Sequence, residues 1–260
     1  MHYLDKGKGF PLLLGHSYLF DGGMWSPQLA ALTERYRVIV PDLWGHGASP
    51  TAGKEYASLT AVAWDHLNLM DKLGIQEFGI IGLSVGGMWG AELAANFPDR
   101  VKLLALLDTF LGEETAAEKQ RYFALLDEVE KAGALAPPVV DYVARQFYSP
   151  QASDALLQPL RTRLASLSAD VLRASIVPLG RLIFGRPDKL ALLEKIRAPS
   201  LVITGEYDQP RPPAEGKIMA DILGCQHITI PGAGHISNRE QPDAVTQALL
   251  DFLQAQPGLS

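Results

Sequence analysis

The sequence has almost no cysteine and no long apolar run. Only one of its 260 residues is a cysteine, Cys225, so no disulfide can form within the chain. A chain of this length can bury a core without disulfides or a metal, and a lone thiol is typical of a reducing compartment. The first apolar run, residues 10–14, is shorter than the 7–15 or so apolar residues of a signal peptide and the roughly 20 of a membrane helix. We therefore expect a cytoplasmic protein that does not bind membranes.

The sequence also has fewer basic than acidic residues. Lysine and arginine total 23 against 29 aspartate and glutamate residues, which gives a net charge of −6. A nucleic-acid-binding protein usually carries the opposite bias, so we expect no nucleic-acid partner. The sequence has no His-x-x-x-His pattern, no cysteine pair and no glycine-rich phosphate loop. We therefore expect neither a metal nor an organic cofactor.

Short apolar runs alternate with amphipathic segments along most of the chain. The runs read as buried parallel strands, at residues 12–15, 37–41, 78–83, 103–108, 200–205 and 227–230. The segments between them have the apolar spacing of helices, most clearly at 58–73, 85–96 and 242–254. This alternation predicts an α/β fold with a doubly wound, mostly parallel sheet.

The alternation stops between residues 112 and 186. This stretch contains four helical patterns and no convincing strand, with helices expected at 113–132, 137–147, 153–167 and 169–184, the last kinked at Pro178. Long insertions of this kind usually serve as lids or binding elements. We therefore expect a sheet domain made of residues 1–111 and 187–260 and an all-helical cap made of residues 112–186.

One motif suggests chemistry. Residues 82–86 read Gly-Leu-Ser-Val-Gly, a G-x-S-x-G pattern between a predicted strand and a predicted helix. A sharp turn at that point strains the backbone of Ser84 and exposes its hydroxyl, and the flanking glycines let strand and helix approach closely. The helix N-terminus adds free N–H groups beside the hydroxyl. Ser84 is therefore the candidate nucleophile.

A serine nucleophile needs a base and an acid to orient that base. His235 follows the predicted strand 227–230 in a glycine-containing loop, and Asp208 follows the strand 200–205. All three residues fall at the carboxyl ends of strands, where open α/β sheets bind their ligands. Their chain order is serine, aspartate, histidine, the order that α/β-hydrolases use. We therefore predict a triad of Ser84, Asp208 and His235.

These blocks resemble the signatures of the α/β-hydrolase superfamily. The resemblance rests on residues 82–87, 205–208 and 232–235, and on residues 41–49, which are similar to the loop after the family's fourth strand. Within the superfamily the serine block is most similar to that of 3-oxoadipate enol-lactonases and small carboxylesterases. The family commonly has two strands before the strand at residues 12–15, but only residues 1–4 precede it here, so seven strands are expected.

The resemblance also implies an oxyanion hole. Its donors would be the backbone N–H groups of Val85 and Tyr18, although Ser17 stands where the family usually has glycine. Some members take their acid from the position of Asp108, which remains an alternative to Asp208. The implied activity is hydrolysis of a small-molecule ester or lactone through an acyl-enzyme. A carbon–carbon bond hydrolase and a slow-turnover small-molecule receptor are the alternatives, and the oligomeric state is not predicted.

Candidate substrate-binding residues are less well defined by the sequence. Aromatic side chains near the predicted site are candidates to line an acyl or alcohol pocket, namely Trp25, Phe110 and Phe147. The cap contains several arginines that are expected mostly to face solvent: Arg145, Arg161, Arg163, Arg173 and Arg181. One of these facing the cleft would select a substrate that carries a carboxylate.

Overall fold

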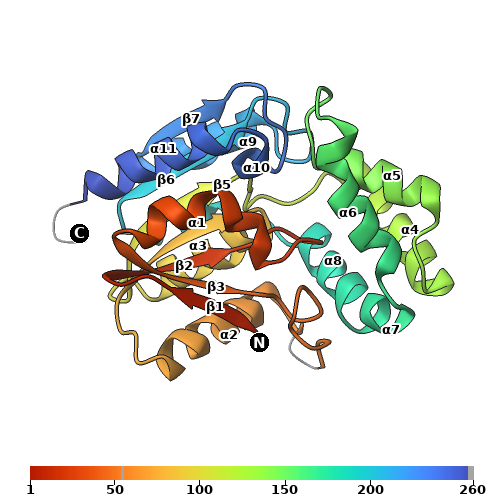
Figure 1. Ribbon diagram of the computed structural model, residues 1–260, viewed down its shortest axis with the longest axis horizontal. Helices are drawn as coiled ribbons and strands as arrows, with labels where there is room; N and C mark the ends of the chain where they lie inside the picture. Colours follow the sequence, from red (N-terminus) through yellow and green to blue (C-terminus); the bar gives the residue numbers. More distant parts are fainter. Residues whose placement is uncertain (54–55, 257–260) are drawn as a thin grey trace.

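A seven-stranded sheet forms the centre of the computed structural model, which describes residues 1–53 and 56–256 (Figure 1). The strands are β1 (Tyr3–Lys6), β2 (Phe10–Gly15), β3 (Tyr36–Pro41), β4 (Phe78–Leu83), β5 (Val101–Leu107), β6 (Ser200–Gly205) and β7 (Gln226–Ile230). Their order across the sheet is β1-β3-β2-β4-β5-β6-β7. Only β1 pairs antiparallel, with β3. The predicted fold class and strand number are confirmed.

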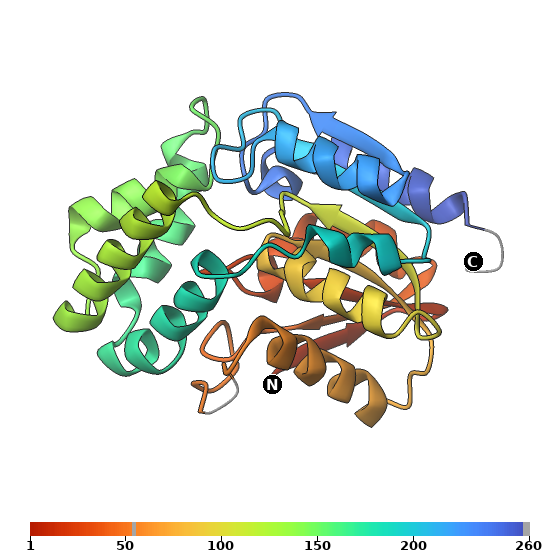
Figure 2. The ribbon, with the colours of Figure 1, turned by 180° about the vertical axis from the view of Figure 1, so that it is seen from behind.

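Helices cover both faces of the sheet, which explains the unbroken apolar runs of its central strands. One face carries α1 (Ser26–Thr33), α10 (Ser237–Glu240) and α11 (Pro242–Gln254), with the 3₁₀ turn η1 (Gly22–Trp25) beside them. The other face carries α2 (Leu59–Lys72), α3 (Val85–Asn96), α9 (Pro213–Leu223) and the 3₁₀ turn η3 (Leu190–Lys195), as the view from behind shows (Figure 2). None of the described helices is long and apolar enough to cross a membrane.

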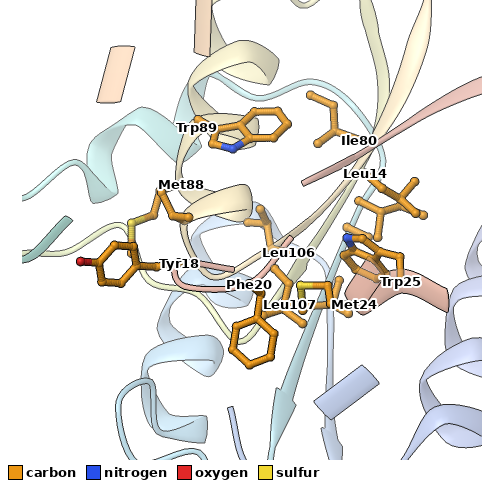
Figure 3. Close-up of a cluster of buried hydrophobic side chains, with 14 of the residues drawn as sticks. Leu14, Tyr18, Phe20, Met24, Trp25, Ile80, Met88, Trp89, Leu106 and Leu107 are labelled. Atoms are coloured by element: carbon orange, nitrogen blue, oxygen red, sulfur yellow. The ribbon is translucent and has the colours of Figure 1, made fainter. Parts of the chain in front are cut away.

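The hydrophobic core lies between these layers. Every residue of β4 is buried, and so is most of β5. Figure 3 shows the indoles of Trp25 and Trp89 among the aliphatic side chains of the central strands. Both indoles are fully buried, and the Trp89 ring stacks on the imidazole of His66 with 3.8 Å between ring centroids. The strands that end at the candidate site therefore sit in a rigid, close-packed layer.

Between β5 and η3 the described chain forms helices, which lie together beside one end of the sheet (Figure 1). They are α4 (Ala116–Ala132), α5 (Pro137–Gln146), α6 (Asp154–Ser166), α7 (Ala169–Val171), the π-helix η2 (Leu172–Ile176) and α8 (Val177–Phe184). A capping box between Thr115 and Glu118 starts α4, and Gly133 ends it in the left-handed conformation. In space α4 packs against α8, and α5 packs against α6.

The last cap helix differs from the prediction. The sequence suggested one helix over residues 169–184 with a kink at Pro178, but a π-helical turn divides it into α7 and α8. Pro178 lies in the first turn of α8. Proline has no N–H to donate, and the first turn of a helix is where that N–H has no partner in any case.

Candidate active site

Ser84 occupies the tight turn between β4 and α3. Its φ is +57°, a backbone conformation that costs energy for any residue with a side chain. A Cβ atom on Gly82 would lie 2.3 Å from the carbonyl oxygen of Gly86, and one on Gly86 would lie 2.4 Å from that of Gly15. Only glycine fits at these two positions. The turn therefore presents the serine hydroxyl at the carboxyl end of β4, beside the N-terminus of α3.

The side chains of Ser84, His235 and Asp208 form one hydrogen-bonded chain. The hydroxyl of Ser84 lies 3.0 Å from Nε2 of His235. Nδ1 of His235 lies 3.0 Å from each carboxylate oxygen of Asp208. All three residues are buried, with at most 7% of their surface exposed. Three loops that are far apart in the sequence, after β4, β6 and β7, thus meet at one edge of the sheet.

The hydrogen bonds assign a tautomer to His235. A carboxylate only accepts hydrogen bonds, so Nδ1 of His235 carries the proton and donates it to Asp208. The lone pair on Nε2 then faces the Ser84 hydroxyl. The backbone N–H of Arg211 also donates to Asp208, at 2.9 Å, which fixes the carboxylate from its other side. This arrangement can accept a proton from Ser84 and stabilise the resulting positive charge on the imidazole.

The second acid candidate has other partners. The carboxylate of Asp108 accepts hydrogen bonds from the N–H of Gly205 and from the hydroxyl of Ser237. Burial, together with the negative charge of the neighbouring Asp208, raises the pKa of Asp108 well above its usual range. The carboxylate that lies against the imidazole of His235 is that of Asp208.

The backbone groups expected to form an oxyanion hole belong to Val85, which directly follows Ser84, and to Tyr18, which lines the same cavity as Ser84. Val85 is the first residue of α3, so its N–H has no acceptor inside the helix. Among the described residues no hydrogen bond from the N–H of Val85 or Tyr18 is found. The Tyr18 side chain is held by a 2.8 Å hydrogen bond from its hydroxyl to the carbonyl oxygen of Ile176 in the π-helix. Both N–H groups are therefore free to donate to a ligand.

A cavity of about 110 Å³ opens above Ser84 and His235. Its walls are mostly apolar and come largely from the cap, from α4, α5, η2 and α8. Phe147 lies on this wall, and its ring centroid is 5.6 Å from that of His235. The sheet domain contributes Tyr18 and Met88. The cavity therefore brings an apolar surface directly against the three polar side chains.

Two of the predicted substrate-binding residues do not line this cavity in the structure. Trp25 ends η1 and is fully buried in the core beneath the sheet, not on the cavity wall described above. Phe110 is also buried outside that wall, and its ring covers Gly112, where a Cβ atom would approach within 2.2 Å. Packing in the hydrophobic core holds the side chain of Trp25, and the contact with the backbone at Gly112 holds the ring of Phe110.

The cap arginines also do not line the cavity. Four pair with acids outside it: Arg145 with Asp141, Arg161 with Asp141 and Asp154, Arg163 with Asp21, and Arg181 with Asp127 and Glu130. The fifth, Arg173, donates to the carbonyl oxygen of Glu130. Among the described residues, the cation on the cavity wall is Arg211, which the sequence reasoning missed. Its position three residues after Asp208 was the available signal.

Arg211 belongs to a buried ion network. Its guanidinium pairs with Glu114, which also accepts a 2.7 Å hydrogen bond from Arg186, and all three side chains are at most 6% exposed. Arg211 also lies 3.4 Å from Glu215, and burial raises the pKa of Glu215 to about 7. Glu114 and Arg186 stand at the two ends of the helical insertion. The network therefore joins both ends of this insertion to the loop that carries Asp208.

The one thiol of the chain, that of Cys225, is half-buried, and burial raises its pKa to about 11. A thiol with such a pKa is a poor nucleophile at neutral pH. In the part of the chain that the structure describes, no group of three or more histidine, cysteine, aspartate and glutamate side chains has the arrangement of a metal site.

Comparison with known proteins agrees with this geometry. Residues 11–242 match the family described as alpha/beta hydrolase fold. The chain is 29% identical over 241 residues to 3-oxoadipate enol-lactonase 2 of Acinetobacter baylyi, covering 92% of this chain and 86% of that protein. Its structure is similar to the enol-lactonase from Burkholderia xenovorans LB400, with a TM-score of 0.86, 28% identity and coverage of 97% and 96% of the two chains. A thermophilic esterase from Thermogutta terrifontis gives a TM-score of 0.85 with 29% identity, covering 97% of this chain and 92% of that one. The chain belongs to the α/β-hydrolase fold family.

Proposed function

We propose that the protein is a serine hydrolase that cleaves a carboxylic ester or lactone. The observation that carries the proposal is the hydrogen-bonded chain from Ser84 through His235 to Asp208 on the wall of an apolar cavity. Similarity to enol-lactonases and an esterase supports the same reaction class. The cavity supplies a low-dielectric surface next to the reacting groups, where electrostatic interactions are strong.

The reaction proceeds in two halves. The Ser84 oxygen attacks the carbonyl carbon of the substrate while Nε2 of His235 takes the hydroxyl proton. The negative charge on the carbonyl oxygen is held by the N–H groups of Val85 and Tyr18. His235 then gives its proton to the leaving alkoxide, and the acyl group stays on Ser84. In the second half His235 removes a proton from water as the water oxygen attacks the acyl carbon. The bond to the Ser84 oxygen then breaks, His235 returns the proton to that oxygen, and the acid is released. Asp208 orients the imidazole and stabilises its charged form throughout.

The cavity favours a neutral substrate with an apolar group over an acidic lactone. The cap arginines that would bind a substrate carboxylate pair with other acids, and the guanidinium of Arg211 is bound by Glu114 and Glu215. A second anion would have to compete with these two carboxylates. The relatives named enol-lactonases therefore support the reaction type, whereas the wall of this cavity supports an apolar acyl or alcohol group.

The test is Ser84→Ala, assayed on a series of p-nitrophenyl esters and on a simple lactone. We expect kcat to fall by on the order of 10⁴–10⁶, because the remaining site cannot form an acyl-enzyme. The exposed cap serine Ser166, changed to alanine, is the matched control and keeps wild-type activity. Mass spectrometry after reaction with a fluorophosphonate should locate the label on Ser84. Residual activity above a tenth of wild type would contradict the mechanism. Turnover below about one per minute on every substrate would favour a receptor.

A further inference from the structure

Asp108 is a buried carboxyl group that the proposed reaction does not use. It follows β5, at the same edge of the sheet as the three reacting side chains, and it is fully buried. Its φ is +47°, an unusual conformation for a residue that is not glycine. Burying a carboxyl group in a strained conformation costs free energy unless its contacts repay that cost. The contacts that offset this cost therefore indicate the role of Asp108.

Each carboxylate oxygen of Asp108 binds a different loop. Oδ1 accepts the backbone N–H of Gly205 at 2.8 Å, and Gly205 is three residues before Asp208. Oδ2 accepts the hydroxyl of Ser237 at 2.5 Å and its backbone N–H at 3.3 Å, and Ser237 is two residues after His235. The backbone N–H of Asp108 itself donates to the carbonyl oxygen of Ile203 in β6, at 2.9 Å. One side chain thus links the loop of the acid to the loop of the base.

The two loops also touch directly beside this link. A Cβ atom on Gly205 would lie 2.1 Å from the carbonyl oxygen of Gly234 and 2.6 Å from that of Ala233. The backbone N–H of Tyr207 donates to the carbonyl oxygen of Ala233 at 2.7 Å. The hydrogen bonds between His235 and Asp208 span these same two loops. A small shift of one loop against the other would therefore lengthen them.

We propose that Asp108 is a positioning residue that clamps the loop of Asp208 to the loop of His235 and so sets the geometry between the catalytic acid and base. The inference rests on the proposed function, because it concerns the same three reacting side chains. It assigns Asp108 a role through its contacts with Gly205 and Ser237, without any contact with substrate. A misplacement of about 1 Å in such a site can cost about 10²-fold in rate.

The clamp is made by hydrogen bonds, and its contacts do not require a charge on Asp108. Burial and the negative charge of Asp208 raise the pKa of Asp108. A hydroxyl can accept as well as donate a hydrogen bond, so the Ser237 hydroxyl can pair with an amide nitrogen at the position of Oδ2. Asparagine has the same shape and no charge, so Asp108→Asn should reproduce the clamp, whereas Asp108→Ala should remove it.

The experiment compares Asp108→Asn, Asp108→Ala and Ser237→Ala on one p-nitrophenyl ester across pH. We expect Asp108→Asn to keep kcat within about threefold of wild type, with an unchanged apparent pKa in kcat/KM. Asp108→Ala should lower kcat by about 10–100-fold while KM stays within about threefold, because the substrate cavity is untouched. Ser237→Ala removes one arm of the clamp and should lower kcat by a smaller factor. This second variant keeps the test open if Asp108→Ala does not fold.

A second measurement does not depend on turnover. The proton on Nδ1 of His235, bound to Asp208, gives a downfield proton resonance in NMR that should persist in Asp108→Asn and shift or vanish in Asp108→Ala. Wild-type kcat and an unshifted resonance in both Asp108→Ala and Ser237→Ala would overturn the inference. So would an Asp108→Asn enzyme that loses activity by about 10³-fold while Asp208→Asn stays active, because Asp108 would then be the acid. If Ser84→Ala remains active while the resonance responds as expected, the proposed function fails and the clamp stands.

Discussion

The sheet domain and the cap build the candidate site in different ways. In the sheet domain, backbone contacts hold the side chains of the proposed triad, and at Gly82, Gly86 and Gly205 even a methyl group has no room. In the cap, ordinary helices contribute apolar side chains from α4, α5 and α8 to the cavity wall. Backbone contacts cannot adjust to a substitution, whereas side chains on a helix face can be exchanged. We therefore expect substitutions in the sheet domain to change the rate of the proposed reaction and substitutions in the cap to change its substrate preference.

Among the substitutions that test this comparison, the largest expected effect comes from one methyl group in the sheet domain. Gly205→Ala places a Cβ atom 2.1 Å from the carbonyl oxygen of Gly234, which forces apart the loops of Asp208 and His235. We expect kcat to fall by at least about 10²-fold. Gly224→Ala is the control, since Gly224 has a φ of +63° and open space around it. It should cost about 1–2 kcal/mol of stability and leave kcat unchanged. Equal kcat values in the two variants would break the comparison.

The junction between the two regions comes next. Glu114→Gln leaves the buried guanidinium groups of Arg186 and Arg211 without their shared carboxylate. Breaking a buried ion pair in this way costs about 3–5 kcal/mol, so we expect a loss of that size in the free energy of unfolding, measured with urea. The neighbouring exposed residue offers a matched control, and Glu113→Gln should change stability by less than about 0.5 kcal/mol. Similar values for both would mean that the network does not hold the cap to the sheet domain.

A substitution on the cavity wall tests selectivity. Val143 lies on α5 and faces the cavity, so Val143→Phe takes up space that a longer acyl or alcohol group would fill. We expect kcat/KM to fall by about 10–100-fold for long-chain p-nitrophenyl esters and by less than about threefold for the acetate. Thr162→Phe on the exposed side of α6 adds the same bulk away from the cavity and should change neither value. A uniform loss across all chain lengths would assign Val143 a role other than selection.

The smallest effect is expected on the outer surface of the cap. Arg145 pairs with Asp141 in solvent, where such pairs contribute at most about 1 kcal/mol. Arg145→Ala should therefore leave kcat/KM unchanged on both a neutral ester and the monoester of a dicarboxylic acid. A loss confined to the acidic ester would mean that this side of the cap recognises a carboxylate after all.

Much of the fold and the site could be predicted because the signals are local. Apolar runs identified the central strands, and the pattern around Ser84 located the turn whose positive φ the structure shows. Asp208 and His235 were predicted from their positions after strands, and the structure brings both to Ser84. The first strand, β1, is mostly exposed and has no apolar run, so it was expected only from the family's strand count.

The sequence was a weaker guide to side chains that have several possible neighbours. Trp25 and Phe110 are aromatic residues near the site in sequence, but the sheet core and Gly112 bury them. Arg211 lies on the cavity wall, where its guanidinium forms an ion pair with Glu114, a residue almost a hundred positions away in the chain. Sequence spacing does not give the distance between such partners.

The sequence by itself determined the succession of strands and helices along the chain. It also determined the tight turn at Ser84 and the positions after strands of the loops that carry Asp208 and His235. These follow from hydrophobic periodicity and from glycines whose missing side chains permit close backbone contacts. The tertiary structure decided which of two buried carboxylates meets the imidazole and which aromatic and charged side chains line the cavity. Those choices depend on packing between segments distant in the chain, where volume and buried charge select one set of neighbours. The shortage of cysteine excluded a disulfide within the chain, and the shortage of positive charge argued against a nucleic-acid partner. Only the folded chain showed that Glu114, Arg186 and Arg211 form a buried ion network.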